Sequence, residues 1–225
     1  MNALLKKIIW LIIITPAIYL AISWNKLPSR IATHYDLKGN PDKYGSKNEL
    51  WLLVGLIALV SVLIYLLITN AYRIDPKKHA VENKDRLFRI AFTVTIFMAV
   101  ISFMIVYSSF TVGLHFNMRF IFVAMGFLWA ILGNYMHNIK PNYFAGFRLP
   151  WTLENEENWR KTHLLGGKLW FFGGLLIALV SLFTTMTVSL IVIFTVLMIL
   201  VIIPVVYSYR LYKKQKQINT TNQSV

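Results

Sequence analysis

The sequence predicts an all-α integral membrane protein with six transmembrane helices, both termini cytoplasmic and a small turn-rich loop outside. Three observations lead to this prediction. Of the 225 residues, 57% are hydrophobic and only 14% are charged, whereas about a quarter of the residues in soluble domains are charged. Apolar runs recur at lengths that suit a bilayer, which needs about 20 residues per helix. Lysine and arginine fall between these runs, where they act as topology signals.

The apolar runs account for six spans. Four are separate and cover residues 8–23, 50–71, 90–112 and about 120–135. We interpret the first as an anchor, because no cleavage site and secreted domain follow it. The stretch 169–207 would be about 60 Å long as one helix, roughly twice the hydrocarbon thickness, and must therefore fold back. The expected turn is a polar cluster of Thr184, Thr185, Thr187 and Ser189.

Charged loops set the predicted orientation. Seventeen of the 23 lysines and arginines fall at the two termini, in 73–89 and in 139–168, and the other six fall in 24–49 and at Arg119. Short loops rich in lysine and arginine stay on the cytoplasmic side. We therefore treat 1–225 as a single six-helix membrane domain, with 24–49 as an external loop and 139–168 as a cytoplasmic loop.

Several function classes are disfavoured by what the sequence lacks. Without cysteine there is no disulfide, zinc-thiolate site or thiol nucleophile. Charged residues within the runs occur only at their ends, at Arg89 and Arg119, which argues against ion pathways and proton relays. No P-loop, nucleophile elbow or dinucleotide fingerprint occurs. We expect no enzyme activity, cofactor, metal or direct nucleic-acid partner.

The external loop has the pattern of a shaped cap. In residues 31–36, apolar and polar side chains alternate and some are β-branched, which predicts a short strand. Residues 39–42 and 44–46 have the composition of turns. Aromatic and hydrogen-bonding side chains in this loop offer a surface for an extracellular ligand: His34, Tyr35, Asp42 and Tyr44. The alternative is a structured connector that only joins two helices.

The cytoplasmic loop predicts a short amphipathic helix at the inner membrane surface. It would begin at Trp151–Thr152, with acidic residues near the positive end of its dipole. Trp159 lies on its apolar side, which leads on to His163. Two glutamate-to-base pairs at i, i+4 would support it: Glu156 with Arg160 and Glu157 with Lys161. Glu156 and His163 lack the spacing of a known metal motif.

Small residues mark the fifth span as a packing surface. Gly174 and Ala178 lie four residues apart, so they share one face of a helix. Small side chains at this spacing let helix backbones approach closely in a membrane. We therefore expect the fifth helix to pack tightly against a neighbour.

Both loops resemble a known family. Residues 142–153 read NYFAGFRLPWTL and are followed by Glu156 and Trp159; this is similar to the signature of the SdpI family of bacterial membrane proteins. Residues 27–47 resemble the short amino-terminal domain, of the DUF1648 type, that often precedes the SdpI domain. The sequence departs from the usual pattern at Leu149, where threonine is common, and at Leu164, where many members carry arginine.

The resemblance implies a bacterial cell-membrane protein that gives immunity to a secreted, membrane-active peptide toxin. In some members it also implies signalling, by holding a transcriptional repressor at the membrane. The partners it implies are membrane lipid, the toxin and possible repressor protein. The functional motif would comprise Asn142, Gly146, Arg148, Pro150, Trp151, Thr152, Glu156, Trp159 and His163.

Two other interpretations stay open. One is a membrane-embedded enzyme or lipid-handling protein that uses Glu156, His163 and Arg148 at the inner interface. The other is a plain structural subunit, in which the motif residues only fix the loop. The enzyme interpretation predicts that Glu156→Gln abolishes an activity, and the structural interpretation predicts that replacing both loops has no functional effect.

Overall fold

The computed structural model describes residues 3–77, 79–110 and 119–223. Six long helices dominate it: α1 Ala3–Ser23, α2 Glu49–Ile74, α3 Lys84–Ser108, α4 Arg119–Met136, α6 Glu156–Phe183 and α7 Met186–Gln223. Each is long and apolar enough to cross a membrane. The six-span prediction is confirmed, and so is the turn at Thr184, because α6 ends and α7 begins on either side of it. The predicted end of the third span, at 112, lies outside the described residues.

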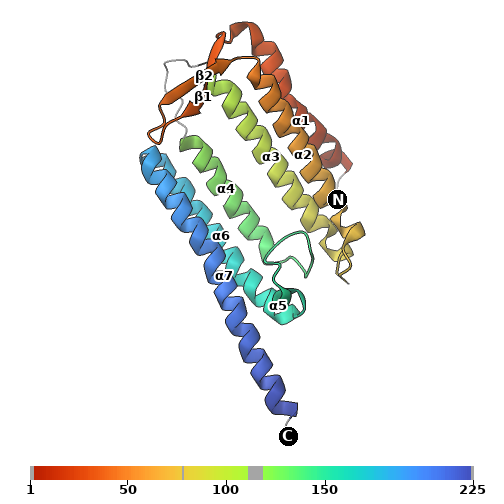
Figure 1. The fold of residues 1–225 in the computed structure, drawn as a ribbon. Helices are drawn as coiled ribbons and strands as arrows, with labels where there is room; N and C mark the ends of the chain where they lie inside the picture. The colour runs from red at the N-terminus through yellow and green to blue at the C-terminus, as the bar shows by residue number, and fades with distance from the viewer. Residues whose placement is uncertain (1–2, 78, 111–118, 224–225) are drawn as a thin grey trace.

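The helices form two groups that lie side by side (Figure 1). α1, α2 and α3 make one group, and α4, α6 and α7 make the other. The closest packing is within the groups, between α2 and α3, between α4 and α6, and between α6 and α7. The groups meet through α3 and α4, which pack less closely. The carboxyl-terminal part of α7 extends beyond the other helices.

Glycines bring α4 and α6 into backbone contact. A Cβ added at Gly133 of α4 would lie 2.5 Å from the amide nitrogen of Phe171. One added at Gly174 of α6 would lie 2.5 Å from the amide nitrogen of Ala130. Neither position has room for a side chain, so the crossing depends on glycine. This confirms the packing surface expected at Gly174 and Ala178 and places it against α4.

A β-hairpin joins α1 to α2 at one end of the bundle, which we call the hairpin end. Strand β1, Arg30–Tyr35, pairs antiparallel with β2, Pro41–Ser46. The strand predicted at 31–36 is confirmed, but the turn predicted at 44–46 is wrong. Tyr44 pairs with Ala32 and Gly45 with Ile31, so ladder hydrogen bonds outweigh the local turn preference of these residues.

The opposite end, called the signature end, is formed by the signature loop, residues 139–155. It contains one short helix, α5 Pro150–Leu153. The separate amphipathic helix predicted from Trp151 is wrong, because α6 begins at Glu156 and runs unbroken through the span. The amino-terminal cap of α6 is Asn155, whose side chain accepts a hydrogen bond from the backbone amide of Asn158. One of the two expected glutamate-to-base pairs is confirmed, because Lys161 Nζ lies 2.7 Å from Glu157 Oε1.

Cysteine labelling tests the predicted orientation. The natural chain has no cysteine, and both Lys43 in the hairpin and Glu154 in the signature loop are exposed. Because the charge distribution places the hairpin end outside, Lys43→Cys should react with a membrane-impermeant maleimide in intact cells. Glu154→Cys should react only after the membrane is permeabilised. The reverse pattern would invert the topology.

Candidate functional site

The signature loop is organised around the buried amide of Asn142. Its Oδ1 accepts hydrogen bonds from the backbone amides of Phe144 and Ala145, each at 2.8 Å. Its Nδ2 donates to the Lys140 carbonyl at 2.8 Å. It also donates to the Ala145 carbonyl at 3.2 Å, so one fully buried side chain bonds four backbone groups of the loop. This explains why an asparagine, with both donors and acceptors, fits the first position of the motif.

Gly146 and His163 form the centre of the motif. Gly146 has φ +99°, and a Cβ there would overlap the Nε2 of His163. The amide of Phe147 donates to this Nε2 at 2.9 Å, while Nδ1 of His163 lies 2.8 Å from the Trp159 carbonyl. These partners require a neutral imidazole with its proton on Nδ1. The ring also stacks on Trp159 with centroids 3.9 Å apart.

Thr152 and Pro150 close the turn that follows. The Thr152 hydroxyl donates to the Phe147 carbonyl at 2.6 Å and accepts from the Leu149 amide at 3.0 Å. Pro150 opens α5, where its missing N–H costs nothing. These residues hold the loop backbone in one conformation.

The connection between α2 and α3 binds the signature loop from the other helix group. Asn83, fully buried, donates to the Lys140 carbonyl at 3.1 Å and accepts from its amide at 2.9 Å. Asp75 accepts from the Tyr143 amide at 3.0 Å, and Lys77 donates to the Leu153 carbonyl at 2.9 Å. Sequence reasoning missed these residues, because nothing in the sequence shows that Asn83 is buried or that it faces the signature loop.

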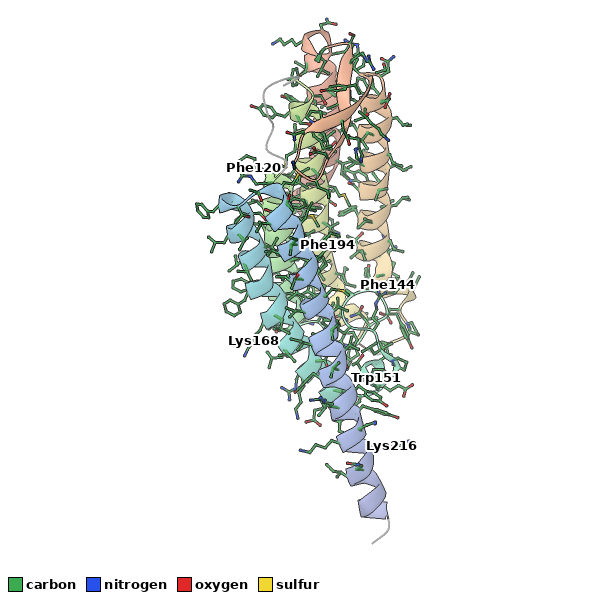
Figure 2. All side chains as sticks on the ribbon, turned by 60° about the vertical axis from the view of Figure 1, so that its left-hand side comes forward. Phe120, Phe144, Trp151, Lys168, Phe194 and Lys216 are labelled. Atoms are coloured by element: carbon green, nitrogen blue, oxygen red, sulfur yellow. The ribbon has the colours of Figure 1, made fainter. Side chains whose placement is uncertain are left out.

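α7 supports the loop from its other side. The side-chain amide of Asn158 donates to the Ser208 carbonyl at 3.0 Å. Sequence reasoning missed this residue too. The indole of Trp151 donates to the Ser208 hydroxyl at 3.0 Å. It also packs against the rings of Tyr209 and Tyr212, with centroids 5.4 and 6.1 Å away. Figure 2 shows Trp151 beside the carboxyl-terminal half of α7.

Two charged residues of the motif lie on the surface around this buried core. Arg148 is exposed, and its guanidinium donates to the Tyr143 carbonyl at 3.0 Å. Glu156 is exposed at the start of α6 and accepts from His79 at 3.2 Å. The site is thus a hydrogen-bonded loop with Arg148 exposed on its surface, followed directly by the exposed Glu156 at the start of α6.

His79 links the α2–α3 connection to α6 and predicts a pH effect. Hydrogen bonds to Glu82, at 2.7 Å, and to Glu156 raise the pKa of His79 above 6.5. Since this pKa is higher in the folded protein, the stabilisation is complete below about pH 6.5 and is lost as pH rises through the folded pKa. Thermal stability in detergent should therefore fall as pH is raised from about 6 to about 8.5.

His79→Gln should flatten this pH dependence. His34→Gln, a histidine change in the hairpin, is the control and should keep it. An unchanged slope in His79→Gln would assign the effect to another group.

The grouping required by the enzymatic alternative is not assembled in the structure. His163 is buried with both ring nitrogens hydrogen-bonded, whereas Arg148 and Glu156 are exposed and have different partners. In the described part of the chain, no three His, Asp or Glu side chains gather as metal ligands would.

At the hairpin end, the four predicted ligand residues do not share one face. His34 Nδ1 and Asp42 Oδ1 lie 2.6 Å apart across the two strands. Tyr35 lines a cavity of about 400 Å³ between the hairpin, α2 and α3, whereas Tyr44 is exposed. The Leu37 carbonyl accepts from Thr187 of α7 at 3.1 Å, so the hairpin connects the two helix groups.

The fold and these two ends define a multi-pass membrane protein. Its signature loop, which the charge distribution predicts to be cytoplasmic, has a buried, hydrogen-bonded core. Residues 138–208 match the SdpI/YfhL protein family, and residues 11–58 match a domain of unknown function, DUF1648. The chain therefore carries an SdpI-family domain preceded by a DUF1648 domain, as the two motifs indicated.

A curated relative covers most of the chain. The immunity protein SdpI of Bacillus subtilis (strain 168) is 29% identical over 182 residues, which are 80% of this chain and 83% of the relative. No solved structure matches. The similarity extends well beyond the two motifs and supports a multi-pass protein of a bacterial membrane.

Proposed function

We propose that this protein gives its cell immunity to a secreted, membrane-active peptide toxin. The observation that carries the proposal is the similarity to an immunity protein over 80% of the chain. It is supported by a signature loop whose core is fixed by Asn142, His163 and Asn83 from separate elements. A rigid loop of this kind presents its exposed groups in a constant geometry, which favours recognition.

The two ends have separate roles in this proposal. The hairpin end meets the toxin, because it holds a shaped cavity and the His34–Asp42 pair. The signature end acts on a partner inside the cell through Arg148, Trp151 and Glu156. Arg148 suits a carboxylate or phosphate, which its guanidinium can bind with two hydrogen bonds.

A signalling role would extend this function to the recruitment of a transcriptional repressor. The carboxyl-terminal part of α7 projects beyond the bundle (Figure 1) and carries Lys213, Lys214 and Lys216. Trp151 packs against Tyr209 and Tyr212 of the same helix. This basic segment favours an acidic protein surface or the anionic inner leaflet.

Deletion and re-expression test the immunity function. Cells without the gene should be more sensitive to a secreted peptide toxin, and the full chain should restore resistance. Replacing residues 36–46 by a flexible Gly/Ser linker should reduce protection at normal membrane abundance, because it removes the shaped cap. Full protection by that variant would make the hairpin a connector.

Point variants test the signature loop. Arg148→Lys, Trp151→Ala and Glu156→Gln should each reduce protection at least about tenfold, the factor that corresponds to the loss of about 1.4 kcal/mol of interaction. Arg210→Lys, on exposed α7 nearby, is the control and should protect normally. Membrane abundance is measured in parallel. If the loop variants act only by lowering abundance, the motif is a folding element and the functional assignment fails.

A further inference from the structure

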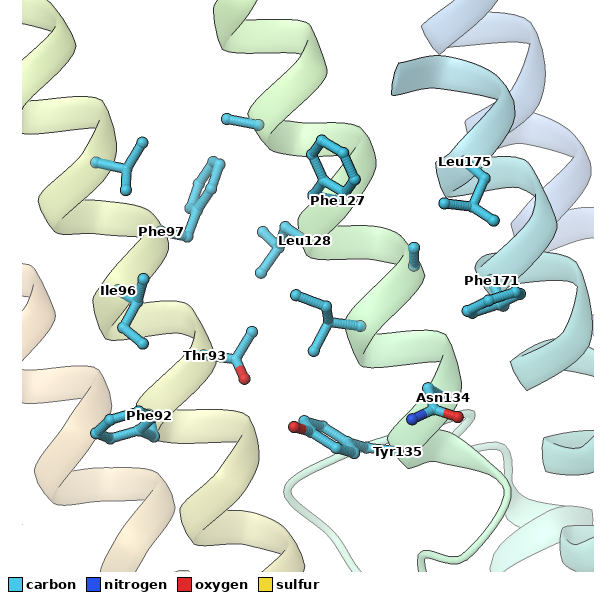
Figure 3. A pocket seen from close by; sticks show the side chains of 14 residues that line it. Phe92, Thr93, Ile96, Phe97, Phe127, Leu128, Asn134, Tyr135, Phe171 and Leu175 are labelled. Atoms are coloured by element: carbon cyan, nitrogen blue, oxygen red, sulfur yellow. The ribbon is translucent and has the colours of Figure 1, made fainter. Parts of the chain in front are cut away.

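An apolar cavity of about 680 Å³ lies where the two helix groups meet. Figure 3 shows Phe97 and Ile96 of α3 directed toward Leu128 of α4, with Phe171 of α6 at the far side. The lining continues along α4 from Ala124 to Tyr135, so the cavity is about 17 Å long at 1.5 Å per residue. This length is close to one leaflet, about half of the roughly 30 Å hydrocarbon core.

Polar groups gather at only one end of this cavity. Asn134 and Tyr135 lie on the last turn of α4, toward the signature loop. Among the described residues, the Asn134 side chain is exposed and has no hydrogen-bond partner. A polar amide at the edge of the hydrocarbon is costly unless something bonds it. The ester and glycerol region of a phospholipid supplies such partners at this depth.

Beyond Asn134 the cavity leads into a recess of about 300 Å³ with basic character. Asn134 and Phe171 belong to both spaces, and His137 and Lys168 lie in the recess. Lys168 projects from the bundle (Figure 2), and no described carboxylate forms a salt bridge with it. A third cavity, of about 490 Å³, shares His137 and is lined by three basic side chains and two acidic ones: Arg86, Lys140, Arg160, Glu156 and Glu157. From the first cavity into the recess, the lining therefore changes from apolar to polar to basic at Lys168, in the order of a lipid's own parts.

We infer that the groove between α3 and α4 is a binding site for one anionic phospholipid. An acyl chain lies among Ile96, Leu128 and Ile131, the ester region meets Asn134, and the phosphate contacts Lys168. Basic recesses between transmembrane helices are suited to anionic headgroups. The inference does not depend on the proposed immunity function.

The charge and shape of the groove favour a lipid over its competitors. A toxin helix is about 10 Å across with its side chains, whereas the groove leads into a smaller recess of about 300 Å³, lined in part by Gly133 and Gly167 at the α4–α6 crossing. A second copy of the chain would bring another Lys168 face to this basic end and would be repelled.

Native mass spectrometry of the purified full chain tests the site. The protein in detergent is offered equal amounts of phosphatidylglycerol and phosphatidylcholine with the same acyl chains. We expect a one-to-one complex that prefers phosphatidylglycerol. Lys168→Gln should lower this preference about fivefold, as expected for one basic side chain at a lipid surface. Lys38→Gln, an equal charge loss in the hairpin, should leave it unchanged.

Ile131→Trp tests the apolar part, because the larger ring would fill the cavity. Binding of both lipids should fall, whereas Leu63→Trp, on a lipid-facing part of α2 outside the cavity, should have no effect. Equal binding of the two lipids by the natural chain, or the same result for Lys168→Gln and Lys38→Gln, would overturn the inference. A dimer that Ile131→Trp dissociates would overturn it too, by giving the groove to a second copy. Lys168→Gln changes only a surface residue, so its result stands even if Ile131→Trp misfolds.

Discussion

Replacing Gly146 by alanine is expected to destabilise the protein by about 2–4 kcal/mol, at the upper end for single substitutions. Two causes act together. The backbone has φ +99°, which L side chains rarely adopt, and the new methyl group would overlap the His163 imidazole. His163 cannot move without losing its bonds to Phe147 and Trp159. We therefore expect the signature loop to detach from α6.

Thermal unfolding in detergent and limited proteolysis of the loop measure this effect. Gly55→Ala is the matched control, because a Cβ at Gly55 of α2 would meet nothing within 4 Å. That variant should keep the stability of the natural chain. Protection from toxin should fall with Gly146→Ala and not with Gly55→Ala. A Gly146→Ala protein with normal unfolding would mean that the loop accommodates a side chain by moving His163.

The spans were predictable because a bilayer imposes a length and an apolar composition on each helix. The start of α6 was not predictable, because its first three turns mix polar and apolar residues. Asn158, Thr162 and His163 have polar side chains, yet all three are buried in the structure. His163 accepts from the Phe147 amide of the signature loop, and the Asn158 side chain donates to the Ser208 carbonyl of α7 and accepts from Thr162. No periodicity within α6 reveals the two partners outside this helix.

The site was predictable as a motif and not as a geometry. The resemblance pointed to Asn142, Gly146 and Trp159. In the structure, the side chains of Asn142 and Trp159 are buried and donate to loop carbonyls, and the backbone at Gly146 lies against His163. Asn83 and Lys77 come from the other helix group, more than 50 residues away in sequence. Contacts of this kind follow from how the two groups meet, which hydropathy does not encode. The hairpin shows the same limit, because pairing across strands decided the conformation of Tyr44.

Two adjacent glycines of α6 should behave differently, because Gly174 faces α4 whereas Gly173 faces α7. A Cβ at Gly174 would lie 2.5 Å from the backbone nitrogen of Ala130 and from the carbonyl oxygen of Gly126. A Cβ at Gly173 would meet only side-chain atoms of α7, the flexible end of Leu200 at 2.8 Å and a methyl group of Val196 at 3.0 Å. Side chains can adopt other rotamers, but two helix backbones must separate.

Gly174→Ala should therefore lower the free energy of unfolding by about 3 kcal/mol, against about 1 kcal/mol or less for Gly173→Ala. Unfolding of both variants by a denaturing detergent, followed by tryptophan fluorescence, makes the comparison. Trp129 of α4 and Trp170 of α6 have ring centroids 4.5 Å apart. They are two of the seven tryptophans in the chain, and their share of the emission should change when the helices separate. Equal losses in the two variants would show that the crossing yields as easily as a side chain. A larger loss in Gly174→Ala would establish that direct backbone contact holds the second helix group together.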